Sequence, residues 1–144
     1  MINIDIRKLM DDIKKIAKHW GFGEIDSSIY AVIVTSERPL TAYEISNKIG
    51  YAYSSTINAL NQMVRAGFLE KKRENGKNVY LPTMDFVDII RKDSENIRSL
   101  LQQIANRIHS LEGKYKQKFE SLLQGIEKAI GYLERAKMKE GSNA

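Results

Sequence analysis

Apolar residues recur every three or four positions along most of the chain, and this spacing predicts a mainly helical protein. The first run ends at Trp20, where two nearby glycines interrupt it. A second helix follows, with Asp26 or Ser27 as its expected N-cap, and Pro39 marks its end. Residues 39–40 can then extend as a minimal strand. The first run contains Ile2, Ile6, Leu9, Ile13, Ile16 and Trp20.

Residues 41–81 carry the most specific local signals. Thr41 and Glu44 have the spacing of a capping box, which starts a helix, and Gly50 is placed to end that helix. A second helix is expected over residues 54–66. The dipeptide Asn75-Gly76 then predicts a hairpin, because a type I′ turn needs positive φ at both central residues. Two short helices followed by a basic hairpin predict a winged helix-turn-helix.

The second of these helices has one apolar side and one polar side. The polar side covers roughly 120° of arc at about 100° per residue and contains neither Lys nor Glu. Its amide, hydroxyl and guanidinium groups can bond base edges and phosphates, which favours nucleic-acid contact over a merely solvated face. The predicted contacts from this helix are Ser54, Ser55, Asn58, Asn61, Gln62 and Arg65.

The predicted hairpin is strongly basic. The formal charge of the chain is +5, and residues 38–81 contain seven basic and three acidic residues, a net charge of +4. A positive charge concentrated on one motif favours a polyanionic partner. The alternative is a charged hairpin edge that resists aggregation. The predicted wing contacts with phosphates or the adjacent minor groove are Lys71, Lys72, Arg73 and Lys77.

The C-terminal half contains two long apolar seams. One runs along a helix expected over residues 84–112, and the other follows Gly113. A single small winged helix cannot cover both seams, so they predict a homodimer. The first helix is expected either to cover its own core or to be shared across that dimer. The predicted organisation is an N-terminal helix (1–22), a DNA-binding domain (23–83), a dimerisation region (84–137) and a frayed tail (138–144).

Residues 39–41 and 67–69, Pro-Leu-Thr and Gly-Phe-Leu, resemble the MarR-type winged-helix regulators. Trp20-Gly21-Phe22 is similar to the branch of glycine-betaine-synthesis repressors, which sense choline. Thr56 and Ile57 reverse the family's usual apolar and polar order, and the wing lacks its Asp-x-Arg element. The resemblance implies an aromatic cage for a quaternary ammonium effector, between the winged helix and the dimerisation helices. The alternative is ordinary core packing. The residues concerned are Trp20, Phe22, Tyr30, Tyr43 and Phe86.

Composition and motifs argue against several other classes of protein, namely metalloproteins, enzymes and membrane proteins. The chain has no Cys, and His19 and His109 have no second ligand at metal spacing, so neither a metal nor a cofactor is expected. No phosphate loop or nucleophile elbow is present, which argues against an enzyme. No apolar run is long enough for a membrane span, and a cytoplasmic location is expected.

The sequence therefore predicts a mainly α, homodimeric winged-helix transcription regulator that binds a near-palindromic duplex operator. The sequence leaves two alternatives for regulation: control by a small-molecule effector, or constitutive binding set by protein concentration. The competing interpretation is a winged-helix adaptor that binds other proteins through its apolar seams and does not recognise a DNA sequence.

Overall fold

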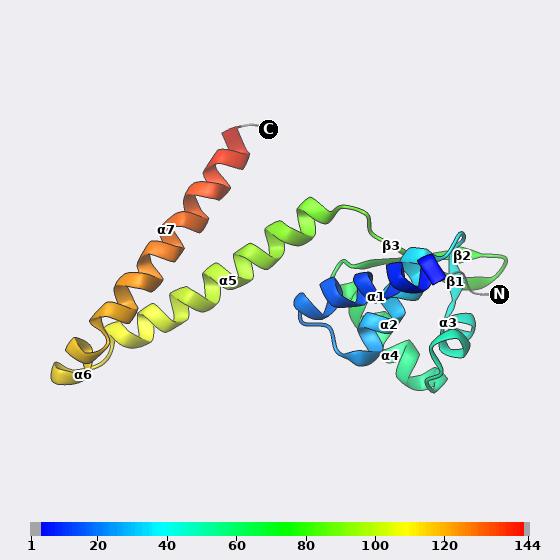
Figure 1. Ribbon diagram of the computed structural model, residues 1–144, viewed down its shortest axis with the longest axis horizontal. Coiled ribbons are helices and arrows are strands. Elements are labelled where there is room, and N and C mark those ends of the chain that lie inside the picture. The colour runs from blue at the N-terminus through cyan, green and yellow to red at the C-terminus, as the bar shows by residue number, and fades with distance from the viewer. Residues whose placement is uncertain (1–3, 143–144) are drawn as a thin grey trace. The chain divides into compact units, whose positions relative to one another are not determined.

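A computed structural model describes residues 4–142. The chain divides into two compact units, Met1–Phe86 and Val87–Ala144, each with its own packing. The architecture is mainly helical with one small antiparallel sheet, which confirms the predicted fold class (Figure 1). The first unit contains α1 (Ile4–His19), α2 (Glu24–Thr35), β1 (Leu40–Thr41), α3 (Ala42–Ile49), α4 (Tyr53–Arg65), β2 (Leu69–Glu74) and β3 (Lys77–Pro82).

The sheet has the order β1-β3-β2, with both pairings antiparallel. The two-residue strand β1 pairs with β3 through Leu40 opposite Tyr80. The hairpin of β2 and β3 is in register from Leu69 opposite Pro82 to Glu74 opposite Lys77. A helical core with a hairpin held to it by a short third strand is a winged helix.

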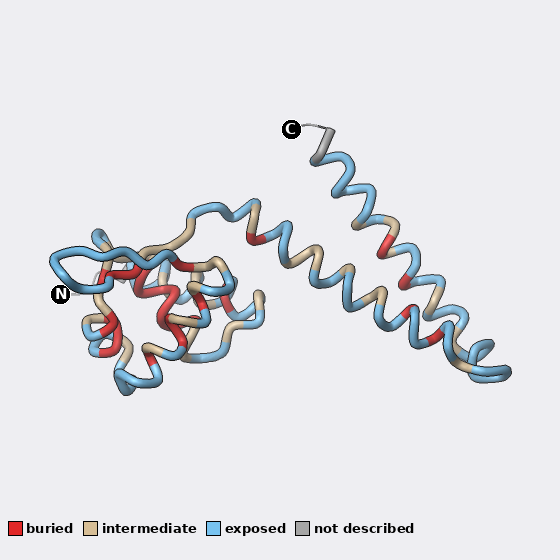
Figure 2. The backbone as a smooth tube through the Cα atoms, turned by 180° about the vertical axis from the view of Figure 1, so that it is seen from behind, coloured by how far each residue is buried: buried red, intermediate tan, exposed pale blue. Residues whose placement is uncertain are grey.

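A single core joins all elements of the first unit. Burial is concentrated in this unit, as the red segments in Figure 2 show. Leu60 of α4, Ile45 of α3 and Ile29 of α2 are each fully buried in one cluster. The sheet contributes through Leu40, Leu69 and Tyr80. The core thereby fixes α4 and the base of the hairpin relative to each other.

The first helix uses only part of its apolar surface inside this unit. Ala17 is buried, and Met10 and Ile13 pack beside it against the core. The exposed members of the predicted seam are Ile6, Leu9 and Ile16. Ile2 lies outside the described residues.

Helix α2 begins earlier than the sequence predicted. Its N-cap is Gly23, which offers no side-chain bond, so the expected cap at Asp26 or Ser27 is wrong. Ser27 is fully buried, and its hydroxyl donates to the carbonyl of Glu24 at 3.1 Å. Ser27 therefore lies inside the first turn of α2, where its hydroxyl bonds a carbonyl of the same helix and does not cap the helix start.

The second unit consists of α5 (Phe86–His109), a short α6 (Gly113–Lys118) and α7 (Glu120–Ser142). Helix α5 is shorter at both ends than the predicted 84–112. The expected break at Gly113 is present, with φ of +53°. Helix α7 continues to Ser142, past residue 138 where the sequence predicted a frayed tail.

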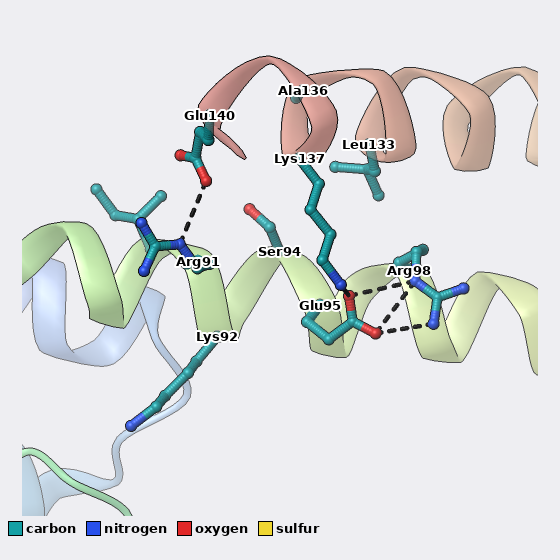
Figure 3. A pocket seen from close by; sticks show the side chains of 10 residues that line it. Arg91, Lys92, Ser94, Glu95, Arg98, Leu133, Ala136, Lys137 and Glu140 are labelled. Carbon is teal, nitrogen blue, oxygen red and sulfur yellow. Dashed lines mark hydrogen bonds and ion pairs between the residues drawn. The ribbon is translucent and has the colours of Figure 1, made fainter. Parts of the chain in front are cut away.

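Helices α5 and α7 pack together near α6 and diverge toward their other ends (Figure 1). The buried contacts near α6 are Ala105 and Ile108 of α5 with Ile126 and Ile130 of α7. At the divergent ends the helices enclose a groove of about 270 Å³ between Ile90, Leu133 and Ala136 (Figure 3).

Ion pairs bridge this groove. Arg91 pairs with Glu140 at 3.3 Å, and Lys137 reaches Glu95 at 3.8 Å. The Arg98 guanidinium, with Lys137 as a smaller influence, holds the pKa of the Glu95 carboxyl below its usual range. The helical hairpin of α5 and α7 is therefore held by apolar contacts at the end near α6 and by exposed ion pairs at the other end.

Candidate nucleic-acid interface

Helix α4 presents its polar side chains to solvent because its other side is anchored in the core. Ala59, Leu60 and Met63 are buried. Thr56 is also fully buried, and its hydroxyl donates to the carbonyl of Ala52 at 2.9 Å. That bond explains how a threonine can occupy a core position, while Ile57 is half-buried against the same core.

The polar side of α4 matches the sequence prediction in its exposure. Asn61 alone among the six predicted residues is half-buried. The exposed members of the predicted set are Ser54, Ser55, Asn58, Gln62 and Arg65. Hydrogen-bonding groups therefore lie together on one accessible helix face.

Helix α3 supports this face through the predicted capping box. The Glu44 amide donates to Thr41 Oγ1 at 3.2 Å, and the Thr41 amide donates to Glu44 Oε1 at 3.1 Å. Gly50 ends the helix in the left-handed region, with φ of +74°. The box and the Gly50 cap are both confirmed.

Arg38 adds a charge to this cap. Its guanidinium donates to both carboxylate oxygens of Glu44, with Nη1 3.2 Å from Oε1. The Arg38 hydrogen bond, followed by the Thr41 backbone bond, lowers the pKa of Glu44 to about 2. The Glu44 carboxylate is therefore occupied and repels an approaching polyanion less than a free carboxylate would.

The hairpin extends away from the core as a basic wing. Asn75 and Gly76 have φ of +51° and +76°, as the predicted Asn-Gly turn requires. On β2 only Leu69 is buried. All four predicted wing bases are exposed: Lys71, Lys72, Arg73 and Lys77. Arg73 Nη1 donates across the hairpin to Asn78 Oδ1 at 3.3 Å, which orients the guanidinium.

A groove separates the wing from the helices. It has a volume of about 440 Å³ and lies between the start of α3, the first turn of α4 and the turn end of the hairpin. Tyr43 and Tyr53 line it with 67% and 54% of their surfaces exposed. Burial, with the neighbouring Tyr53 as the smaller influence, raises the pKa of Tyr80 at the same groove. Sequence reasoning placed neither Tyr53 nor Asn78 at a site, because three separated segments form the groove.

The predicted effector residues do not all come together. Trp20, Phe22 and Tyr30 form one aromatic cluster, with ring centroids 5.8 to 6.3 Å apart. Phe68, which the sequence reasoning missed, stacks on Trp20 and meets Phe22 edge to face. Tyr43 instead lines the groove beside the wing.

Tyr30 is the unusual member of this cluster. Its ring is 1% exposed, and its hydroxyl has no hydrogen-bond partner among the described residues. Burial raises the pKa of that hydroxyl. Phe86, the remaining predicted effector residue, begins α5 and is exposed.

Two further kinds of feature, metal-ligand clusters and membrane-spanning helices, are absent from the part of the chain described. Residues 4–142 contain no group of three or more His, Asp or Glu side chains placed to hold a metal. Within the same residues, no helix is both long and apolar enough to cross a membrane. His109 lies 3.4 Å from Glu127, as a surface pair between α5 and α7.

Residues 17–84 match the model of a protein family described as the sugar-specific transcriptional regulator TrmB. The match spans the end of α1 through the wing, so it covers most of the winged helix of the first unit. No curated protein is similar enough in sequence to be matched to this chain.

Several solved structures are similar in fold. One, described as a transcriptional regulator, covers 96% of this chain and 99% of its own, with a TM-score of 0.63 and 8% identity. The ST1889 protein of the thermoacidophilic archaeon Sulfolobus tokodaii covers 67% of this chain and 97% of its own, with a TM-score of 0.52 and 18% identity. A MarR family regulator from Streptomyces coelicolor covers 89% of each chain, with a TM-score of 0.45 and 13% identity.

Proposed function

We propose that this protein is a homodimeric, cytoplasmic transcription regulator that binds duplex DNA in a sequence-specific manner. The observation that carries the proposal is the polar face of α4, which is exposed on the side opposite its buried anchor residues. Helices of this width fit the major groove, where amide and guanidinium groups can distinguish base pairs. Asn58, Asn61, Gln62 and Arg65 are assigned to that readout, with Ser54 and Ser55 beside them.

The wing supplies the part of the affinity that is independent of sequence. Lys71, Lys72, Arg73 and Lys77 are exposed on a hairpin that stands beside α4. Each Lys or Arg that neutralises a phosphate releases counterions, so binding should weaken steeply as salt rises. Replacing a contacting wing base should reduce the salt slope by about 0.9 and leave the preferred sequence unchanged.

The dimer is proposed from the second unit. Helix α5 packs on α7 through Ala105 and Ile108, whereas Ile97, Leu100 and Ile104, on the same face and its flank, are exposed. A second copy that covers this stripe would bury it in a two-fold interface. Two symmetric recognition helices imply a near-palindromic operator, with half-sites about 10 base pairs apart or a multiple of that.

The test compares two matched double variants on a site selected from random duplex. Asn58→Ala with Arg65→Ala removes one amide and one guanidinium from α4, and affinity should fall at least tenfold, since each base contact contributes about 1–3 kcal/mol. Gln124→Ala with Arg135→Ala removes the same groups from exposed positions of α7 and should leave affinity unchanged.

The competing function is a protein-binding adaptor. In that case the wild-type protein would not select any duplex sequence, and the α4 double variant would behave like the α7 control. The absence of salt-sensitive duplex binding by the wild-type protein would overturn the proposed function.

Control by an effector is a finer part of the proposal. The buried Tyr30 hydroxyl, which has no partner among residues 4–142, supports it, because leaving such a group unsatisfied costs about 1–3 kcal/mol. A ligand with an acceptor group could relieve that cost within the Trp20 cluster. The sequence resemblance suggests choline or betaine, and the description of the matched family model adds sugars as a second class.

A further inference from the structure

The groove between the wing and the helices brings together a second set of anion-binding groups. Tyr43 comes from α3, Tyr53 from the first turn of α4, and Arg73 and Lys77 from the hairpin. All four side chains are exposed. The groove therefore places two phenol donors and two cations around one open space of about 440 Å³.

The one carboxylate on this groove is already occupied. Glu44 pairs with Arg38 and accepts from the amide and hydroxyl of Thr41. Its charge is therefore balanced inside the protein. The groups left available are donors and cations, which suit a chain of phosphates better than a neutral ligand.

The position of the groove identifies which phosphates these are. With α4 in the major groove and the wing at the adjacent minor groove, the strand that separates the two grooves must cross the space between them. We propose that the Tyr43 and Tyr53 hydroxyls donate hydrogen bonds to consecutive phosphates of this strand, and that Arg73 and Lys77 neutralise them. This inference rests on the proposed DNA binding, and it assigns contacts that are distinct from base readout by α4.

Tyrosine contacts have a signature that separates them from lysine contacts. A phenol that donates to a phosphate adds a charge-assisted hydrogen bond but displaces no counterion. Loss of the hydroxyl should therefore lower affinity equally for every sequence and leave the salt slope unchanged. Loss of Lys77 should instead reduce the slope by about 0.9.

The first arm of the test uses Tyr53→Phe and Tyr43→Phe in the full chain. Each should weaken binding to specific and random duplex alike by about tenfold or more, as expected for a hydrogen bond to a charged group. Tyr51→Phe is the matched control, since Tyr51 is exposed in the adjacent turn but does not line the groove. Circular dichroism checks that all three variants remain folded.

The second arm changes the DNA and leaves the protein intact. Methylphosphonates, which are uncharged, replace single phosphates in turn along the strand between the two grooves. One or two positions should weaken the wild-type protein, and the same substitutions should cost Tyr53→Phe or Tyr43→Phe several-fold less. This non-additivity would locate the hydroxyl at that phosphate.

The outcomes separate this inference from the proposed function. If the α4 double variant loses affinity while Tyr43→Phe and Tyr53→Phe match Tyr51→Phe, DNA binding stands and the tyrosine contacts are overturned. If every methylphosphonate costs wild type and Phe variants equally, the tyrosine contacts are overturned as well. If the wild-type protein does not bind duplex, both proposals fail.

Discussion

The two units of this chain differ in how much of their apolar surface they bury by themselves. Among the described residues, the cluster in the winged helix contains thirteen buried apolar residues, drawn from every helix and strand of that unit. The cluster in the helical hairpin contains four, all at the end near α6. The first unit has the core of an independent domain, whereas the second leaves apolar surface exposed, as the proposed dimer requires.

The exposed residues of α4 and the wing also differ in kind from those of α5. The winged helix exposes amides, hydroxyls and basic groups on α4 and the wing. The helical hairpin of α5 and α7 exposes large apolar side chains on α5, with Leu100 at 58% and Ile97 and Ile104 at 45%. Polar exposure fits contact with DNA, and apolar exposure fits contact with a second copy. The two proposed interactions therefore use separate surfaces and can be broken separately.

The largest expected effect comes from placing a charge on the apolar stripe of α5. Leu100→Glu should dissociate the dimer, because burying an unpaired carboxylate at the interface costs several kcal/mol. Sedimentation at micromolar concentration should change from dimer to monomer. Affinity for the selected near-palindromic site should fall by about a hundredfold or more, since two linked half-site contacts become independent.

Ser99→Glu is the control for this variant. It adds the same charge to the next residue of α5, which is exposed and lies about 100° around the helix from Leu100. It should leave both the dimer and DNA affinity near wild type. A wild-type protein that sediments as a monomer at micromolar concentration would overturn the dimer proposal.

A smaller effect is expected from the cap that holds α3 in the winged helix. Glu44 has its pKa lowered from 4.5 to about 2, so its charged form stabilises the folded state above pH 4.5. That contribution should be lost as pH falls from about 4.5 toward 2. Glu44→Gln retains a capping-box side chain but not the charge. It should therefore destabilise the protein by about 1 kcal/mol near neutral pH.

The measurement is the free energy of urea unfolding at a series of pH values. Other carboxylates titrate in both proteins, so the difference between wild type and Glu44→Gln isolates this group. That difference should shrink as pH falls below about 4.5 and approach zero near pH 2. A difference that stays constant from pH 7 to pH 2.5 would contradict the assignment of the low pKa to Glu44.

The local features predicted correctly from sequence are those determined by residues close together in the chain. The Thr41 and Glu44 capping box, the Gly50 cap and the Asn75-Gly76 turn each depend on residues within one turn of each other. The polar side of α4 also follows from helical spacing alone. Local chemistry of this kind needs no knowledge of distant contacts.

Apart from the start of α2, the features missed are those that depend on contacts between distant segments. The spacing predicted the apolar seam of α5 but not which residues of that helix pack on α7: Ala105 and Ile108 are buried there, whereas Ile97 and Ile104 are exposed. The Tyr43 and Tyr53 groove needs the wing to close it, and no periodicity reports that meeting. Phe68 joined the aromatic cluster for the same reason: its partners lie more than 30 residues away.

The smallest expected effect concerns the aromatic cluster and the buried hydroxyl of Tyr30 within it. Tyr30→Phe removes a hydroxyl with no partner among the described residues, so unfolding stability should be unchanged or rise. A satisfied buried hydroxyl would give the opposite sign. Urea unfolding at pH 7 measures this change and tests whether the site is strained without a ligand.

The same variant then serves as the control for an effector titration. Trp20 is the only tryptophan in the chain, and its ring lies 5.9 Å from those of Tyr30 and Phe68, so its emission should report a ligand bound in this cluster. Betaine, whose carboxylate can accept from the Tyr30 hydroxyl, is compared with choline and with a neutral sugar. An effector should change Trp20 emission and operator affinity together, by about fivefold at a coupling near 1 kcal/mol, and DNA should change its affinity by the same factor. Tyr30→Phe should weaken the response to a ligand that bonds the hydroxyl. If none of the three alters either signal in the wild-type protein, effector control through this cluster is wrong for these ligand classes, and protein concentration alone would set operator occupancy.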